Sequence, residues 1–177
     1  MKVGLLIASP QMRDPNFART VVLLCQHDAE GSLGVVINRM TNLTIQELLD
    51  QLDVDVTDSA GQQVLWGGPM EQTAGFVVFS GQLESDTGWN LPDSLAVSPS
   101  RQQLQEVLIE EIPYCLCLGY AGWGPGQLDD EIKTGSWLYT EIDRSLVLDT
   151  PVDERYDDAL KSLGLTASQV WMVPIDE

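Results

Sequence analysis

Short apolar runs rich in β-branched residues constrain the fold of this chain more than any other feature of its sequence. Runs of this kind, bounded by glycine, proline or polar residues, are typical of buried strands. Six of them occur, at residues 3–9, 20–27, 33–38, 63–67, 75–81 and 114–118. The core of the protein is therefore expected to be a β-sheet.

Two of these runs are expected to pair as a hairpin. Residues 20–27 and 33–38 are separated by DAEGS, a length and composition that suit a hairpin loop with Gly31 at a positive φ angle. The triplet Gly67-Gly68-Pro69 separates the runs at 63–67 and 75–81, and it continues neither a strand nor a helix. Direct connections of this kind favour antiparallel pairing.

Three segments carry helix signals. Thr44 and Glu47 form a capping box, and Ser100 begins a second segment with similar cap chemistry. Pro151 starts a third, which Gly164 closes. Apolar residues recur along one face of the first segment, at Ile45, Leu48, Leu49 and Leu52. Strands mixed with helices predict one α+β domain over residues 1–177, with a mixed, largely antiparallel sheet flanked by helices.

The charge balance bears on the class of partner. Nine Lys and Arg residues stand against 27 Asp and Glu residues, a net charge of −18. A chain this acidic repels nucleic acid and anionic membranes, so direct binding to either is not expected. Residues 1–42 hold four basic and three acidic side chains, a net of +1, which leaves −19 for the rest. An anion-binding surface would therefore involve the N-terminal part.

Composition also predicts the setting of the protein. With 177 residues and 44% hydrophobic residues, the chain can bury one good core. No run approaches the roughly 18 apolar residues needed to span a bilayer, and the N-terminus lacks the pattern of a signal peptide. Three cysteines do not make a disulfide framework. We therefore expect a cytoplasmic protein with reduced thiols.

A glycine-rich stretch, GYAGWGPGQLDDE at residues 119–131, raises the question of a phosphate site. It lacks the lysine and the Ser or Thr of a Walker loop, and its spacing is not G-x-G-x-x-G. Asp129, Asp130 and Glu131 would lie in the first turn of the following helix and would repel a phosphate there. No nucleotide or other cofactor is expected.

Three cysteines and one histidine are the candidates for a metal site or a catalytic nucleophile. Cys25 with His27, and Cys115 with Cys117, could form a Cys3His zinc set if their strands faced each other. Residues i and i+2 of a strand lie about 7 Å apart, whereas zinc ligands usually come from tight turns, so buried thiols and no metal are expected. His27 is the one histidine, and without a G-x-S-x-G or H-E-x-x-H motif a structural role for it is favoured.

Several blocks of the sequence resemble the signature motifs of a known protein family. GLLIASP, FARTVVLLCQHDAEGSLGVVINR, GGP and above all GYAGWGPGQLDDEI, followed by WL, resemble the signature blocks of the YqgE/AlgH family of bacterial proteins over almost the whole chain. The matching positions are Arg19, Asn38, Gly67, Gly68, Pro69, Gly119, Tyr120, Gly122, Trp123, Gly126, Gln127 and Glu131. The resemblance implies a compact α+β fold with a barrel-like mixed sheet and a proposed regulatory role in the synthesis of alginate.

The resemblance supplies no catalytic residues, and the sequence departs from the family pattern at three positions. Met40 replaces a proline often found after Asn-Arg, Phe79 stands where relatives commonly have histidine, and Asp129 replaces the usual glutamate. A chemistry that needed a histidine at position 79 would be impossible in this protein.

Two functional hypotheses follow. The first is a non-enzymatic regulatory module that binds a small ligand or a protein partner, with Arg19, Tyr120, Trp123, Gln127 and Glu131 lining one shared groove. The full set of candidate binding residues is Arg19, Asn38, Gly67, Gly68, Tyr120, Trp123, Gln127 and Glu131. Any effect on transcription would pass through partners. The alternative is a small-molecule hydrolase in which Glu131 or Asp129 acts as general base and Arg19 stabilises negative charge. The first is favoured because the sequence shows no nucleophile–base pair.

Overall fold

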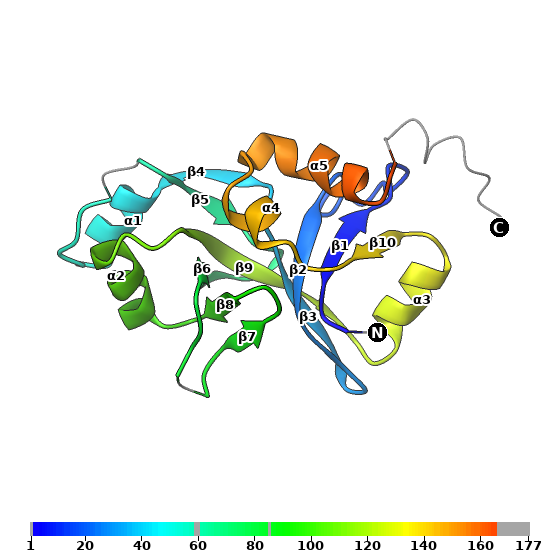
Figure 1. Ribbon diagram of the computed structural model, residues 1–177, viewed down its shortest axis with the longest axis horizontal. Coiled ribbons are helices and arrows are strands. Elements are labelled where there is room, and N and C mark those ends of the chain that lie inside the picture. Colours follow the sequence, from blue (N-terminus) through cyan, green and yellow to red (C-terminus); the bar gives the residue numbers. More distant parts are fainter. Residues whose placement is uncertain (1, 59–60, 85, 166–177) are drawn as a thin grey trace.

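A single ten-stranded sheet runs through the protein (Figure 1). The computed structural model describes residues 2–58, 61–84 and 86–165. Along the sheet the strands follow the order β10 (Trp137–Thr140), β1 (Leu5–Ala8), β2 (Val21–Asp28), β3 (Gly31–Val36), β9 (Tyr114–Trp123), β6 (Met70–Ser80), β8 (Leu95–Ser98) and β7 (Trp89–Leu91). Within the described ranges β10 does not pair with β7, so the sheet is not closed into a barrel.

Two further strands branch from the middle of this path. β5 (Gln63–Trp66) pairs with β9 in parallel, and β4 (Met40–Thr44) pairs with β5 in the antiparallel sense. The other pairings of the described sheet are antiparallel. The prediction of an α+β fold with a mixed, largely antiparallel sheet is confirmed.

Strand β9 is the junction of the sheet. One edge of β9 pairs with β6, while the other edge pairs first with β5 and then, near Trp123, with β3. Gly67 joins these strands, because its N–H donates to the carbonyl of Leu118 at 2.7 Å and its carbonyl accepts from Val36 at 2.8 Å. Gly68 lies so close to β9 that a Cβ there would be 2.1 Å from the carbonyl carbon of Tyr120. The Gly-Gly pair is therefore required by close backbone packing.

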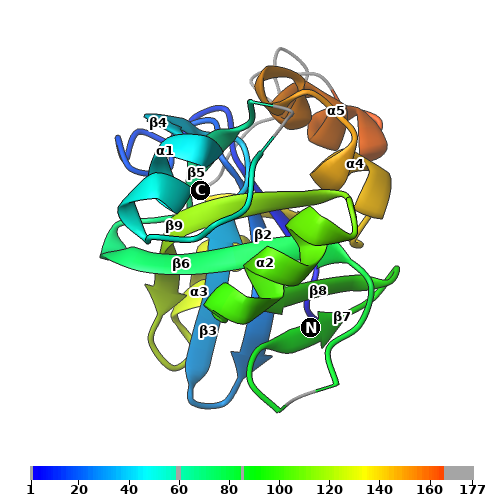
Figure 2. The same cartoon turned by 90° about the vertical axis from the view of Figure 1, so that its left-hand side faces the viewer.

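In the part of the chain that the structure describes, five α-helices flank the sheet. α1 (Ile45–Gln51) and α2 (Arg101–Ile109) lie at one end, in front of β6 and β9 in Figure 2. α4 (Arg144–Leu148) and α5 (Arg155–Ser162), the latter preceded by a 3-10 turn at Val152–Glu154, lie together, and α5 contacts β1 and β2. α3 (Gln127–Lys133) lies beside β10. None of the helices in the described ranges is long and apolar enough to cross a bilayer.

The buried side chains form two clusters. The larger one includes Leu23, Trp137 and Leu160, and it extends from β1, β2 and β3 across β9 to β6, β7 and β8, with side chains of α3, α4 and α5 packed against it. The smaller one includes Leu49 and Leu104 and lies under α1 and α2. The capping box of α1 is confirmed, since the Glu47 N–H donates to Thr44 Oγ1 and the Thr44 N–H donates to Glu47 Oε1. The stripe predicted for this helix thus supplies one of the two cores.

The structure corrects several element boundaries. β3 starts at Gly31, with the predicted positive φ of 138°, so the hairpin turn is two residues long rather than five. β9 continues to Trp123, so the first part of the glycine-rich stretch is strand, and only residues 124–126 form a loop. Five short elements were not predicted, because three to five residues show too little periodicity; they are β4, β7, β8, β10 and α4.

Candidate functional site

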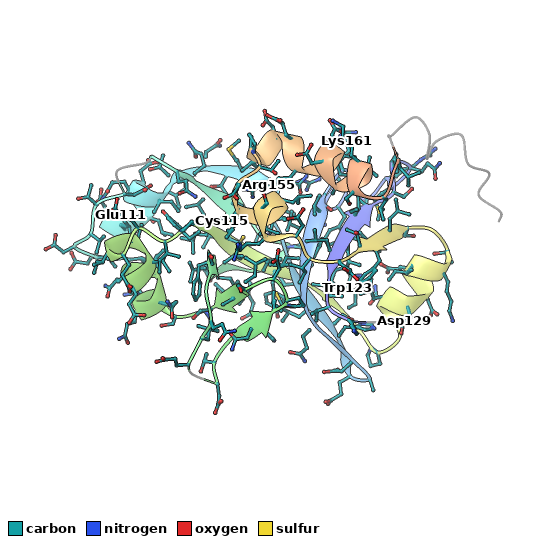
Figure 3. All side chains as sticks on the ribbon, viewed as in Figure 1. Glu111, Cys115, Trp123, Asp129, Arg155 and Lys161 are labelled. Atoms are coloured by element: carbon teal, nitrogen blue, oxygen red, sulfur yellow. The ribbon has the colours of Figure 1, made fainter. Side chains whose placement is uncertain are left out.

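A hollow of about 240 Å³ lies where the end of β9, the start of α3, the start of β10 and the segment before β2 meet. We call it the aromatic hollow. It is lined by Met12, Asp14, Phe17, Gly122, Trp123, Gln127, Glu131, Ser136 and Trp137. Figure 3 labels Trp123 and Asp129 on this side of the molecule, away from Cys115 and Arg155. The hollow holds three of the residues that the sequence selected, which makes it the candidate site.

The carboxylate of Glu131 organises the aromatic hollow. Its Oε1 accepts hydrogen bonds from the indole N–H groups of Trp123 and Trp137, both at 3.0 Å. Its Oε2 accepts from Gln127 Nε2 at 2.8 Å. β9, α3 and β10 therefore converge on one side chain. Hydrogen bonds to an ionised acceptor are stronger than neutral ones, so this carboxylate is held rigidly.

Three aromatic rings form one wall of the hollow. The centroids of Trp123 and Trp137 are 5.9 Å apart, and that of Phe17 lies 6.4 Å from Trp123 and 5.7 Å from Trp137. Two of the contacts are edge-to-face, a favoured geometry for aromatic pairs. The indoles are 7% and 2% exposed, whereas Phe17 is only half-buried. Phe17 is thus the ring that a ligand can reach most readily.

The loop between β9 and α3 is fixed by its own hydrogen bonds. Gly126 adopts the left-handed conformation, with φ at 75°, at the start of α3. Gln127 Oε1 accepts from the Gly124 N–H at 3.0 Å, and the Gln127 N–H donates to the Gly124 carbonyl at 3.1 Å. Gln127 therefore connects the loop to Glu131 and keeps both in place.

The segment that carries Phe17 is also fixed. Asp14 Oδ1 accepts from the Asn16 N–H at 2.9 Å, and the Phe17 N–H donates to the Asp14 carbonyl at 3.0 Å. Arg39 donates to the carbonyls of Asn16 and Ala18. Burial lowers the pKa of the Arg39 guanidinium, and the nearby Asp14 carboxylate partly opposes that shift. Phe17 and Asp14 thus face the hollow from an ordered turn.

Two of the predicted binding residues lie elsewhere, which corrects the expectation of one shared groove. Arg19 pairs with Asp157 at 3.6 Å on the surface and stacks over the ring of Tyr156 at 4.6 Å. Tyr120 donates to Glu71 Oε2 at 3.1 Å. Neither residue lines the aromatic hollow. Side chains alternate along β9, so Tyr120 and Trp123 point to opposite faces.

The remaining candidates have structural positions. Asn38 Oδ1 accepts from the Val21 N–H, and its Nδ2 donates to the Arg19 carbonyl, both at 2.8 Å. Gly67 and Gly68 pack against β9 as described above. Of the predicted set, the structure brings together Trp123, Gln127 and Glu131.

The sequence did not single out six of the lining residues for binding, namely Met12, Asp14, Phe17, Gly122, Ser136 and Trp137. Trp137 lies six residues after Glu131 in the WL dipeptide that follows the glycine-rich block. Its indole N–H needs an acceptor once the ring is buried, but Glu141 is nearer in sequence than Glu131, so sequence distance alone does not identify the partner. Phe17 is brought to the site by pairing of β1 with β2, for which a local sequence pattern gives no signal.

His27 connects the β2–β3 hairpin to α3. Its Nδ1 lies 2.6 Å from Ser32 Oγ, and its Nε2 lies 3.3 Å from Asp129 Oδ1. The residue types are those of a Ser–His–Asp triad, but Ser32 is only 8% exposed and does not line the aromatic hollow. A hydroxyl placed in this way is not presented to a substrate. The contacts tie two elements together.

The three cysteines are buried in the core. Cys25, Cys115 and Cys117 are free thiols in the larger core cluster, and burial raises the pKa of Cys25 to about 12. In the part of the chain that the structure describes, no three His, Cys, Asp or Glu residues are grouped as metal ligands. The thiols are thus placed as buried apolar side chains.

Comparison with known proteins finds relatives over nearly the whole chain. The sequence profile described as AlgH-like matches residues 5–168. A UPF0301 protein of Photobacterium profundum is 36% identical over 173 residues, covering 93% of this chain and 92% of that protein. A UPF0301 protein of Paraburkholderia phymatum is 38% identical over 170 residues, with 93% and 89% covered.

Two solved structures have the same architecture. The solution structure of the AlgH protein from Pseudomonas aeruginosa matches with a TM-score of 0.77 and 33% identity, covering 99% of this chain and 95% of that one. The crystal structure of protein DIP2367 from Corynebacterium diphtheriae has a TM-score of 0.78 at 22% identity, covering 98% and 93%, and supports the fold alone. On this evidence the chain belongs to the AlgH-like family of bacterial UPF0301 proteins.

Proposed function

We propose that this AlgH-like protein is a non-enzymatic binding module of the cytoplasm, with a regulatory role exerted through what it binds. The aromatic hollow receives either a small ligand or one side chain of a protein partner. The observation that carries the proposal is the carboxylate of Glu131, which three hydrogen bonds hold at the edge of an aromatic wall. A polar group fixed beside apolar surface is the arrangement that ligand sites use for orientation and affinity.

The size of the hollow supports a small occupant. Its volume of about 240 Å³ lies just below the 300–1,000 Å³ typical of drug-sized ligand pockets. Because the loop at residues 124–126 and the turn that bears Phe17 are already hydrogen-bonded, little ordering entropy is lost on binding. This hollow suits a metabolite fragment or a single side chain rather than a dinucleotide.

Charge supports regulation through partners rather than through nucleic acid. The net charge of the chain is −18, and two carboxylates line the aromatic hollow. Both the net charge of the chain and the carboxylates of the hollow would repel a phosphate backbone. If the protein affects transcription, it does so by binding a protein or a small molecule.

The geometry does not favour the hydrolase alternative. Arg19, the expected stabiliser of negative charge, pairs with Asp157 instead. Glu131 already accepts three hydrogen bonds, and Asp129 contacts His27. A general base and an electrophilic group must converge on one reacting atom, and these three residues do not meet at the aromatic hollow.

A ligand screen with three variants tests the proposed function. Metabolites and short peptides would be tested by thermal shift on the wild type, on F17L, on Q127A and on Y120L. Because ligand binding raises apparent stability by mass action, a true ligand raises the melting temperature of the wild type. The shift should fall in F17L and Q127A and persist in Y120L, whose side chain lies outside the hollow. A ligand shift that Y120L abolishes and F17L leaves intact would place the binding site elsewhere.

A further inference from the structure

We infer that the aromatic hollow selects a cation, namely an ammonium or guanidinium group carried on a short carbon chain. This inference rests on the proposed function and specifies the chemical class of the occupant. It is carried by three independent properties of the lining, which are its charge, its balance of hydrogen-bond donors and acceptors, and its apolar wall.

The charge of the lining is negative. Asp14 and Glu131 are the ionisable residues in the lining, which contains no lysine, arginine or histidine. A cleft walled by one sign of charge and by low-dielectric side chains concentrates ions of the opposite sign.

The guanidinium of Arg39 offsets part of this charge from outside the lining. The Asp14 carboxylate is close enough to Arg39 to raise the pKa of the guanidinium. The hydrogen bonds of Arg39, however, go from Nη1 and Nη2 to the carbonyls of Asn16 and Ala18. Its guanidinium also stacks over the ring of Trp66, with 5.2 Å from Cζ to the centroid. Arg39 is therefore held outside the lining and leaves room for a second cation.

The lining also has more unused acceptors than donors. Both indole N–H groups are used on Glu131 Oε1, and one N–H of Gln127 is used on Oε2. A carboxylate can accept about four hydrogen bonds, so Glu131 retains capacity for one more. Asp14 uses Oδ1 within its own turn and retains Oδ2. An occupant that satisfies these oxygens must be a donor, and ammonium and guanidinium groups have donors and no acceptors.

The apolar wall accounts for the carbon chain. Phe17 and Met12 present half-buried apolar side chains next to the carboxylates. An amine with a short alkyl stem can place methylene groups on this wall and its charged end at Glu131 and Asp14. The face of an aromatic ring adds a cation–π attraction. An inorganic cation would gain nothing from the wall, so a small organic cation fits the lining best.

The same chemistry occurs in two sources, a free amine or guanidine and a Lys or Arg side chain on a partner protein. The volume of about 240 Å³ corresponds to about eight water molecules at about 30 Å³ each, enough for either one. Both sources carry the same cationic group, which has several hydrogen-bond donors. Titration with free amines and with capped peptides can distinguish a free small cation from a side chain of a partner protein.

Calorimetric titration of the wild-type protein with four probes of similar size tests the inference. Butylammonium and butylguanidinium carry the cation, 1-butanol is the neutral control, and butyrate is the anionic control. We expect the cations to bind at least about tenfold more tightly than 1-butanol, which corresponds to about 1.4 kcal/mol, and butyrate not to bind. Equal affinity for 1-butanol, binding of butyrate, or no binding of either cation at millimolar concentration would overturn the inference.

Two matched variants locate the effect. D14N removes one charge from the lining but retains an oxygen that can accept from the Asn16 N–H. D130N removes the same charge from an exposed position of α3 that does not line the hollow. Cation affinity should fall several-fold in D14N and change less than twofold in D130N. If both variants weaken binding equally, the effect comes from net charge, and a cation site in the hollow is contradicted.

Further titrations separate the two sources and the two proposals. Capped Lys and Arg peptides that match or exceed the affinity of the free amines assign the site to a partner protein, and weaker binding assigns it to a free small cation. If neutral compounds from the ligand screen bind in a Phe17-dependent way while the cations do not, the binding module stands and the cation class fails. If no compound of any charge depends on Phe17, both fail.

Discussion

Glu131 shows how one side chain can both stabilise the fold and shape a site. Its carboxylate joins Trp123 and Trp137, which lie on different strands, and Gln127, which lies one turn earlier on α3. A ligand does not have to organise these groups, because the fold has already done so. This pre-organisation is the residue-scale basis of the proposed function.

Removal of this carboxylate should destabilise the protein measurably. E131A leaves two nearly buried indole N–H groups without their acceptor, so we expect a loss of about 3 kcal/mol in the free energy of unfolding. Urea denaturation followed by circular dichroism would measure the loss. D130A, on the exposed face of the same helix, should change stability by less than about 0.5 kcal/mol. Equal stabilities for the two variants would contradict the assigned role of Glu131.

The three thiols should be inert in the native protein. All three are buried, and burial raises the pKa of Cys25 to about 12. The hydrogen bond between Cys115 and Cys117 raises the pKa of Cys117 and lowers that of Cys115, so burial alone shields Cys115 from a reagent. Ellman's reagent at pH 8 should release almost no colour from the folded protein and three equivalents from the protein in denaturant. Rapid reaction of a thiol without denaturant would show that the core opens or that a thiol is placed differently.

At the residue scale, the sequence selected three of the residues that line the aromatic hollow. The glycine-rich block pointed to Trp123, Gln127 and Glu131 because polar and aromatic residues between glycines are typical of functional turns. It could not predict Phe17, which reaches the site through the pairing of β1 with β2. It wrongly placed Tyr120 there, because the continuation of β9 as a strand turns Tyr120 to the other face.

At the scale of elements, local signals predicted α1 well. The capping box and the apolar stripe both agree with the packing of this helix on the sheet. The short elements escaped prediction because their stability comes from pairing across the sheet and not from local pattern. β10, for example, has four residues and is held by four register positions on β1.

The capping box makes a pH-dependent prediction. The Thr44 backbone N–H donates to the Glu47 carboxylate and, with the Thr44 hydroxyl, lowers its pKa, although desolvation opposes the shift. A carboxylate whose pKa is lower in the folded state stabilises the fold above its unfolded pKa of about 4.3, and this contribution is lost as the pH falls through the folded pKa. E47Q should therefore be less stable than the wild type at pH 7, with a smaller difference at pH 3 by urea denaturation. A constant difference would contradict this role.

Arg155 should be the main polar anchor of α5. Its guanidinium is 5% exposed and donates to the carbonyls of Ile37 and Thr150 at 2.7 and 2.8 Å. R155M would leave both carbonyls without this donor while it removes the cost of burying a charge, so we expect a net loss of about 2 kcal/mol. Differential scanning calorimetry would measure it. R144M, at an exposed position of α4, is the control, and a loss equal to that of R155M would contradict the anchoring role.

At the scale of the whole molecule, the acids lie around the sheet and not on it, because Asp28 and Glu71 are the only acidic residues of the described strands. The net charge of −18 on 177 residues implies self-repulsion in the compact state. A change from low ionic strength to about 0.1 M salt shortens the screening length to about 10 Å. The melting temperature should therefore rise with added sodium chloride. If it stays constant or falls, repulsion among these acids does not limit stability.

The fold class was predictable because apolar runs, turns and caps are local features that agreed with one another. The closure of the sheet was not. Whether β10 meets β7 depends on twist and strand order over the whole molecule, and the structure shows an open sheet in the described ranges.

The most direct test of the account is a nuclear magnetic resonance titration of the indole N–H signals with butylammonium. Both Trp123 and Trp137 donate to Glu131 in the aromatic hollow, whereas Trp66 and Trp89 lie outside its lining. The account predicts saturable shifts of the Trp123 and Trp137 signals, with those of Trp66 and Trp89 unmoved. Signals of Trp123 and Trp137 that stay still, or that move no more than those of Trp66 and Trp89, would contradict it.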